Sequence, residues 1–162
     1  MLHAHMERSI VMLFWNYVFT GEDCTSAIKG KGKVGPLKKL QKNPRFLKTF
    51  QHLGEDWKVK SEFHEELEKF TYLMYGYQRE KNLNEVGTMM LTKMVGNDER
   101  INPKSRVNLS LFPPCVDAHR PHVDRVNHRV ALFKRSKFPI YDAQKLCEGQ
   151  GWEKHGDLLK PI

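Results

Sequence analysis

Apolar residues recur along most of the chain at the spacing of α-helices, so we expect a mainly α fold built as a small helical bundle. Residues 9–20 are apolar nearly all round, which is typical of a core helix, here ending at Gly21. A glycine-rich hairpin at 21–35 then leads into a short helix at 36–42. The first part of the chain is therefore predicted to be two helices joined by a hairpin.

Two helices with clearer signals follow. Asn43 is expected to be an N-cap and Pro44 the first position of a helix that stops at Gly54. Ser61 is expected to begin the next helix, and Gly76 to end it. The apolar stripes of these helices contain Phe46, Phe50, Leu53, Phe63, Leu67, Phe70 and Met74. We expect the phenylalanines to lie in the core rather than to stack on bases.

The second half of the chain is less regular. Residues 84–95 form a weaker helix candidate, whereas 96–114 contain several Gly, Asn and Pro breakers. Pro121 is expected to begin an amphipathic helix, and the end around 149–152 is either a short hairpin or loose. One structural unit with three parts is predicted: a helix-hairpin-helix and helical region (1–95), an irregular connector (96–120), and a C-terminal helix and tail (121–162).

The charge of the chain indicates more than a plain helical domain, because it favours binding to polyanions. The 162 residues carry a formal net charge of +8. Basic residues cluster between Lys29 and Lys48, and no acidic residue lies between Asp23 and Glu55. An inert basic surface is the alternative, but this clustering favours nucleic acid.

Cysteine content and the first apolar run bear on location. Cys24, Cys115 and Cys147 are far apart, which fits reduced thiols in an intracellular protein. The run at 9–20 is shorter than the roughly 20 residues that span a bilayer, and Phe19-Thr20-Gly21 is a poor signal-peptide cleavage site. We expect no membrane partner and a nuclear rather than cytoplasmic location. A signal peptide is the less favoured interpretation of the run at 9–20.

The segment from Gly21 to Lys33 carries the strongest candidate chemistry. Gly30 and Gly32 have no Cβ, so backbone N–H groups there can approach an anion closely, ahead of a helix. We expect these N–H groups to bind one phosphate and the nearby lysines to neutralise its neighbours. Those lysines are Lys29, Lys31 and Lys33, followed along the strand by Lys38, Lys39 and Lys42. A plain turn without a ligand is the alternative.

A zinc site is a weaker candidate. Cys115, His119, His122 and His128 are residue types that bind zinc, but their spacing matches no common zinc framework. We therefore expect these histidines to be solvated or to cap helix ends. The glycines do not match a P-loop, and nothing resembles a nucleophile with its base.

The hairpin pattern also resembles a known family. Its residues are Gly21, Asp23, Ile28, Gly30, Gly32 and Leu37. The pattern is similar to the helix-hairpin-helix segment of the flap endonuclease and XPG nucleases, and more closely to a large group of uncharacterised animal proteins with a PIN-like nuclease fold. Further similar motifs lie at 42–46, 53–57, 84–86, 113–115, 122–127 and 151–152, so the resemblance covers about residues 9–162. Glu22 and Cys24 depart from the residues common in that group.

The resemblance implies the C-terminal portion of a larger α/β PIN-like domain. Nucleases of this kind gather carboxylates from several strands around two divalent metals, here Mg²⁺, for phosphodiester hydrolysis. By position Asp23 would be one metal ligand, or else a turn cap. Glu7 is the sole carboxylate before Glu22, so we expect no cofactor in this chain alone and no hydrolysis by it.

The sequence thus predicts binding to nucleic-acid backbone without sequence preference, to DNA rather than RNA. One alternative is part of a structure-specific, metal-dependent nuclease, completed by an N-terminal PIN-like portion or a partner chain. The other is a helical protein-interaction fragment without nucleic-acid function, in which the helix at 9–20 presents the exposed interface.

Overall fold

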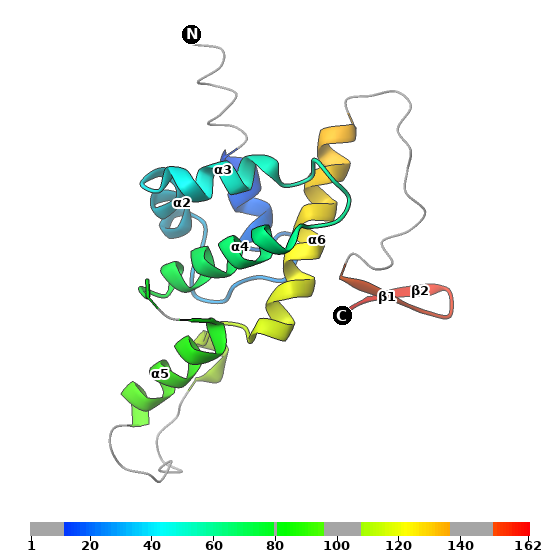
Figure 1. Cartoon of the computed structure of the whole chain (residues 1–162). Helices are drawn as coiled ribbons and strands as arrows, with labels where there is room; N and C mark the ends of the chain where they lie inside the picture. The colour runs from blue at the N-terminus through cyan, green and yellow to red at the C-terminus, as the bar shows by residue number, and fades with distance from the viewer. Residues whose placement is uncertain (1–11, 80, 96–107, 137–150) are drawn as a thin grey trace.

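The chain folds as a helical bundle with one short β-hairpin, confirming the mainly α expectation (Figure 1). The computed structural model describes residues 12–79, 81–95, 108–136 and 151–162. Helical residues 12–19 come first. The later elements are α2 (Val34–Gln41), α3 (Pro44–His52), α4 (Ser61–Met74), α5 (Leu83–Val95), the 3₁₀ helix η1 (Leu109–Leu111), α6 (Val116–Arg135), β1 (Trp152–His155) and β2 (Leu158–Pro161).

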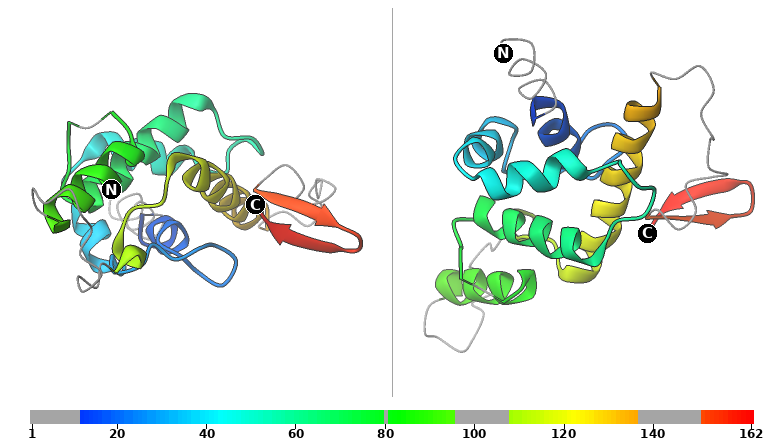
Figure 2. Two further views of the ribbon diagram at one scale, coloured as in Figure 1. Left: turned by 90° about the horizontal axis from the view of Figure 1, so that it is seen from below. Right: turned by 45° about the horizontal axis from the view of Figure 1, so that its top comes forward.

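Helix α4 lies at the centre of the arrangement, in contact with α2, α3, α5 and α6. The long helix α6 runs along one side of the bundle, and α5 lies at the end of the molecule near the start of α6 (Figures 1 and 2). Strands β1 and β2 pair antiparallel, with Trp152 opposite Pro161, and project away from the bundle beyond α6 (Figure 2). None of the described helices is long and apolar enough to cross a membrane.

Three phenylalanines form the centre of the core. Phe19, Phe50 and Phe70 are fully buried, and their ring centroids are 5.1 to 5.8 Å apart in edge-on or tilted contacts. Such edge-on pairs add to the stabilisation from burial alone. Phe46 packs against this cluster, and the half-buried Phe63 stacks on His52. The expectation that the phenylalanines are core residues is confirmed at Phe50 and Phe70.

Several helix boundaries agree with the local signals. Helix α3 begins at Pro44, α4 begins at Ser61, and Gly54 and Gly76 follow the two helices with φ of +75° and +89°. Asn43 stands at the predicted N-cap but makes no capping hydrogen bond; its Nδ2 donates to Lys39 O at 2.6 Å. The prediction of Asn43 as the N-cap residue and Pro44 as the first helical residue is therefore confirmed, although Asn43 occupies that position without a side-chain capping hydrogen bond.

Helix α6 begins at Val116, so the prediction of a start at Pro121 is wrong. Its first turn is held by α5, where Asn84 Oδ1 accepts a hydrogen bond from Val116 N–H at 3.0 Å. Pro121 lies inside the helix, where it removes only one backbone donor. The connector predicted over 96–120 is thus helical in its last part; residues 96–107 lie outside the described ranges.

Two further expectations need correction. The helical residues 12–19 are not buried all round, because Leu13 and Tyr17 are about half exposed while Val18 and Phe19 are fully buried. Of the two possibilities expected for the C-terminal end, the short hairpin is the one present, but its turn lies near Gly156 rather than around 149–152. In both places the predicted kind of secondary structure is correct, and the packing of the elements determines which residues face the solvent.

The histidines of α6 are core residues, and the expectation that they are solvated or cap helices is wrong. His119, His122 and His128 are all buried. His119 Nε2 lies 2.8 Å from Thr71 Oγ1, and His122 Nε2 donates to Phe19 O at 2.9 Å. Burial lowers the pKa of His119 to about 3 and that of His122 to about 4. Both imidazoles are therefore neutral partners in a buried polar layer.

Candidate nucleic-acid interface

The turn at 29–33 joins the helix at 12–19 to α2 and owes its shape to two glycines. Gly30 and Gly32 have φ of +78° and +58°, which side-chain-bearing residues rarely adopt. A Cβ on Gly32 would meet no atom within 4 Å, whereas one on Gly30 would lie 3.1 Å from Leu111 Cδ2. Lys31 N–H closes the turn by donating to Ile28 O at 3.2 Å. The space beside Gly32 is therefore open to a ligand, and Gly30 is partly covered by η1.

The start of α2 directly after this turn has unused backbone donors. Its N-cap residue, Lys33, makes no side-chain capping hydrogen bond, and the first turn contains no acidic residue. The first N–H groups of a helix lack partners within the helix and lie at the positive end of its dipole. The amides of Val34 and Gly35 thus add to the attraction that the turn has for an anion.

The three lysines of the turn have different environments. Lys29 is exposed. Lys31 Nζ lies 3.7 Å from the centre of the Tyr75 ring, and its pKa is lowered by burial and by the nearby Lys39. Lys31 and Lys39 are therefore close enough to repel each other, as two cations along one strand of phosphates would be.

Lys33 differs from the other two because its ammonium serves the fold. Its Nζ donates to Tyr17 O at 2.9 Å and to Gly21 O, and it lies 4.3 Å from the centre of the Tyr17 ring. Asn16 Nδ2 in turn donates to Lys33 O at 2.9 Å. Lys33 thus binds the carbonyl end of the helix at 12–19, a contact that no local sequence pattern predicts. A phosphate would have to compete with these carbonyls for the ammonium group of Lys33.

The remaining cations of the predicted interface lie on and after α2. Lys38 and Lys42 are exposed, and neither they nor Lys29 forms an ion pair with another residue in the described ranges. Arg45, by contrast, is paired with Glu66. Among the described residues, the exposed charge of the basic cluster that no ion pair offsets therefore lies at Lys29, Lys38, Lys42 and Lys48.

Asp23 is exposed at the turn that precedes these lysines, and Glu22 beside it is already paired. Arg129 Nε donates to Glu22 Oε1 at 2.6 Å. Thr25 closes this turn, since its Oγ1 accepts from Glu22 N–H at 2.9 Å and donates to Val18 O at 2.7 Å. No group of three or more His, Cys, Asp or Glu suited to a metal occurs among the described residues. A metal role for Asp23 stays a prediction that needs ligands from elsewhere.

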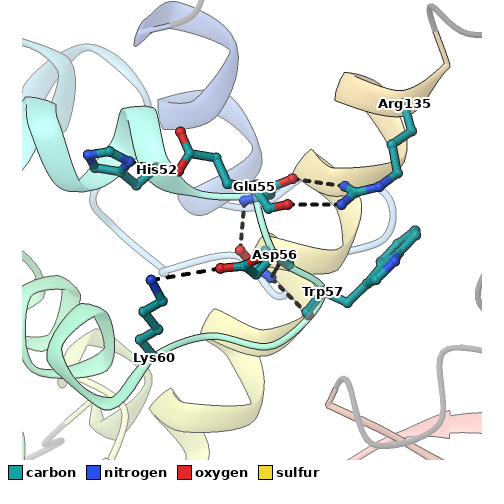
Figure 3. Close-up of polar contacts among 8 residues, drawn as sticks. His52, Glu55, Asp56, Trp57, Lys60 and Arg135 are labelled. Atoms are coloured by element: carbon teal, nitrogen blue, oxygen red, sulfur yellow. Dashed lines mark hydrogen bonds and ion pairs between the residues drawn. The ribbon is translucent and has the colours of Figure 1, made fainter.

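A second polar region, the loop at 54–57, is held rigidly by α6 (Figure 3). Asn127 Oδ1 accepts from Gly54 N–H at 2.7 Å, and its Nδ2 donates to the carbonyls of Asp56 and Trp57 at 2.9 and 3.0 Å. Arg135 donates to the carbonyls of Gly54 and Glu55, each at 2.9 Å, and its guanidinium lies 4.2 Å from the centre of the Trp57 ring. One amide and four carbonyl contacts of this loop are thus made by two side chains of α6.

The charged side chains around this loop neutralise one another. His52 Nδ1 lies 2.8 Å from Glu55 Oε2, and this contact lowers the pKa of Glu55. Lys60 Nζ and Asp56 Oδ2 lie 3.8 Å apart; this ion pair is drawn in Figure 3. The adjoining cavity of about 510 Å³ is lined by both signs of charge. This region is therefore a folded junction rather than a site for one class of charged ligand.

The sequence pointed to the lysines and glycines of the turn but missed the partners that hold them. Asn16, Tyr17 and Tyr75 hold the turn at Lys31 and Lys33, and each lies on a segment that looks like an ordinary helix in the sequence. Comparison of the chain with protein-family models, with curated proteins and with solved structures finds no match.

Proposed function

We propose that this chain binds the backbone of nucleic acid, DNA in preference to RNA, without reading its sequence. The observation that carries the proposal is the group of unpaired, exposed lysines Lys29, Lys38 and Lys42 around an open glycine turn. No acidic residue between Asp23 and Glu55 offsets their charge. The resemblance of the turn to the helix-hairpin-helix of flap endonuclease-like proteins rests on the same glycines and points to the same function, and a nuclear location is part of the same proposal.

The mechanism is electrostatic. One phosphate is bound by N–H groups of the turn and of the first turn of α2, and the exposed lysines neutralise neighbouring phosphates. Each neutralised phosphate releases counterions, so the logarithm of the binding constant falls with the logarithm of salt concentration by about 0.9 per contact for duplex DNA. Without base contacts, affinity near physiological salt is expected at a Kd of about 10⁻⁴ to 10⁻⁶ M.

The test compares two double charge reversals that alter the net charge equally. Lys38→Glu with Lys42→Glu changes the proposed interface, whereas Lys154→Glu with Lys160→Glu changes exposed lysines on β1 and β2. Binding of a labelled duplex is measured by fluorescence anisotropy over a salt series. The first variant should bind more weakly for all sequences and lower the salt slope by about 2, and the second should behave like the unchanged chain.

Equal losses in the two variants would show that only net charge matters and would overturn the assignment to the turn and α2. Absence of salt-sensitive binding in the unchanged chain would overturn the proposal itself and favour the protein-interaction alternative. Lys33→Glu is unsuited to this test, because Lys33 also binds the helix at 12–19.

The second candidate is a part of a Mg²⁺-dependent nuclease, favoured by one observation. Asp23 is exposed beside the turn, and its carboxylate accepts no hydrogen bond from the residues that the structure describes, so it is available to a metal shared with other carboxylates. Residues suited to hold the ion with it would come from an upstream portion or a partner chain. Cleavage of a flap-bearing DNA with Mg²⁺, lost in Asp23→Asn, would support this candidate; no cleavage in any longer form would exclude it.

A further inference from the structure

A cavity of about 420 Å³ lies beside the glycine turn, between residues 26–29, the segment 109–114 and α6. Its volume falls in the range of roughly 300–1,000 Å³ that small-molecule sites occupy. Leu111 of η1 approaches Gly30, and Tyr75 Oη donates to Phe112 O at 3.1 Å. The walls of the cavity are thus joined to the turn and to α4 by contacts that keep them in place.

The cavity combines apolar walls with positive charge. Phe112, Pro113 and Pro114 supply rings, as does Tyr75, one face of which is covered by Lys31. Lys29 and Arg125 supply cations. No acidic side chain lines it, in contrast to the mixed-charge cavity beside the loop at 54–57.

Arg125 is the buried cation of this cavity. Its guanidinium donates to Gly151 O at 2.8 Å, to Ile162 O at 3.1 Å and to Ser26 Oγ at 3.2 Å. Its acidic neighbour in the sequence, Asp124, lies 3.2 Å from His64. Burial of the guanidinium lowers the pKa of Arg125, and the nearby charge of Asp124 acts in the opposite direction. Arg125 therefore places a buried positive charge, held in position by its three acceptors, at the wall of the cavity, where it would attract an anionic group.

We propose that this cavity binds one nucleoside monophosphate unit, with its base against the ring-bearing wall and its phosphate toward Lys29 and Arg125. Aromatic faces accept any base, and the lysine shared with the glycine turn connects the cavity to the surface where the backbone is expected to lie. The inference rests on the proposed nucleic-acid binding, which makes a bound strand one possible source of this nucleoside monophosphate unit. The unit comes either from a free mononucleotide or from a strand that lies on the turn.

The experiment fills the cavity and measures binding of deoxyadenosine 5′-monophosphate to the full chain by calorimetry at low salt. Ser110 of η1 and Ala118 of α6 both line the cavity and are exposed, so Ser110→Phe and Ala118→Phe fill it from two different elements. Thr92→Phe, on the exposed surface of α5, is the matched control. The unchanged chain and the control should bind with a Kd below about 1 mM, and both filled variants at least about tenfold more weakly.

Three further measurements decide what is recognised. Deoxyadenosine and inorganic phosphate should each bind at least about tenfold more weakly than the monophosphate, because each lacks half of the recognised chemistry. A single-stranded oligonucleotide that competes at lower concentration than the mononucleotide assigns the unit to a strand, and equal competition assigns it to the free nucleotide. The Lys38→Glu, Lys42→Glu variant should keep its mononucleotide affinity, which separates this inference from the proposed duplex binding.

The inference is overturned if the filled variants, folded by circular dichroism, bind the monophosphate as tightly as the control does. It is also overturned if inorganic phosphate binds as well as the nucleotide, since the apolar walls would then play no part. A failure of duplex binding with nucleotide binding intact would count against the proposed function alone.

Discussion

The turn at 29–33 and the loop at 54–57 are built from similar residues, but these residues make different contacts. Each contains a glycine in the left-handed region next to charged side chains. A Cβ on Gly32 would meet nothing within 4 Å, but a Cβ on Gly54 would lie 2.6 Å from Ala131 N. The loop at 54–57 is pressed against α6, whereas the turn at 29–33 faces open space.

A glycine next to charged residues is therefore evidence of a binding site only when the surrounding polar groups have no partners within the fold. At the loop, Asn127 and Arg135 of α6 satisfy the backbone, and neighbouring side chains pair with one another. At the turn, Lys29 stays exposed and α2 begins without a cap. The glycine and charged residues of the loop are therefore explained by the contacts that hold the fold together, whereas the turn keeps a charge and backbone donors that a ligand could bind.

The largest predicted effect is that of Gly54→Ala. The left-handed φ and the close approach of α6 together should lower the free energy of unfolding by about 4 kcal/mol, measured by urea denaturation. Gly32→Ala is the matched change in the turn and should cost only about 1 kcal/mol, because its Cβ has space. Similar losses at the two glycines would break the comparison.

Asn127→Ala should destabilise the chain by about 3 kcal/mol. The change leaves Gly54 N–H without its acceptor and the carbonyls of Asp56 and Trp57 without their donor. Asn108→Ala, at an exposed asparagine, is the control and should cost much less. Duplex binding measured where both variants are folded should be unchanged, and a weakened affinity in Asn127→Ala would show that the loop also takes part in binding.

Acid should destabilise the core through the buried histidines. His119 and His122 are neutral when folded, with pKa values of about 3 and about 4, whereas the unfolded chain takes up protons near pH 6.5. The stability is therefore complete above about pH 6.5 and falls as the pH drops toward those lower values, by about 2 to 3 kcal/mol at pH 5.5.

Denaturation at pH 7.5 and 5.5 measures this loss. His119→Gln keeps a donor toward Thr71 but does not titrate, so it should reduce the pH dependence by about half. An unchanged pH dependence in this variant would place the acid-sensitive groups elsewhere in the molecule.

The smallest effects separate the two kinds of lysine within the turn. Lys33→Met should lower stability by about 1 kcal/mol, because two carbonyls lose their charged donor. Lys29→Met should leave stability unchanged and reduce the salt slope of DNA binding by about 0.9. The reverse pattern, a stability loss at Lys29 and a changed slope at Lys33, would exchange their assigned roles.

Much of the fold could be predicted from local sequence signals. Pro44 and Ser61 begin helices as expected, and Phe50 and Phe70 are core residues, because capping and helical periodicity depend on neighbours a few positions away. The start of α6 could not be predicted this way, since it depends on Asn84 of α5. The lysines and glycines of the candidate interface are visible in the sequence. The different roles of Lys33 and Lys29 could not be predicted, because they depend on where Tyr17 lies in the fold.

The helical class, the cluster of positive charge and the two glycines that shape the turn can be predicted from the chain alone, because each follows from composition or from short-range pattern. Which of these groups remain available to a ligand depends on how the elements pack. The tertiary structure pairs Glu22 with Arg129, 107 residues away, and buries His119 and His122 against α4 and the helix at 12–19. The physical reason is that polar groups become satisfied or exposed through contacts between distant elements, which no local pattern specifies.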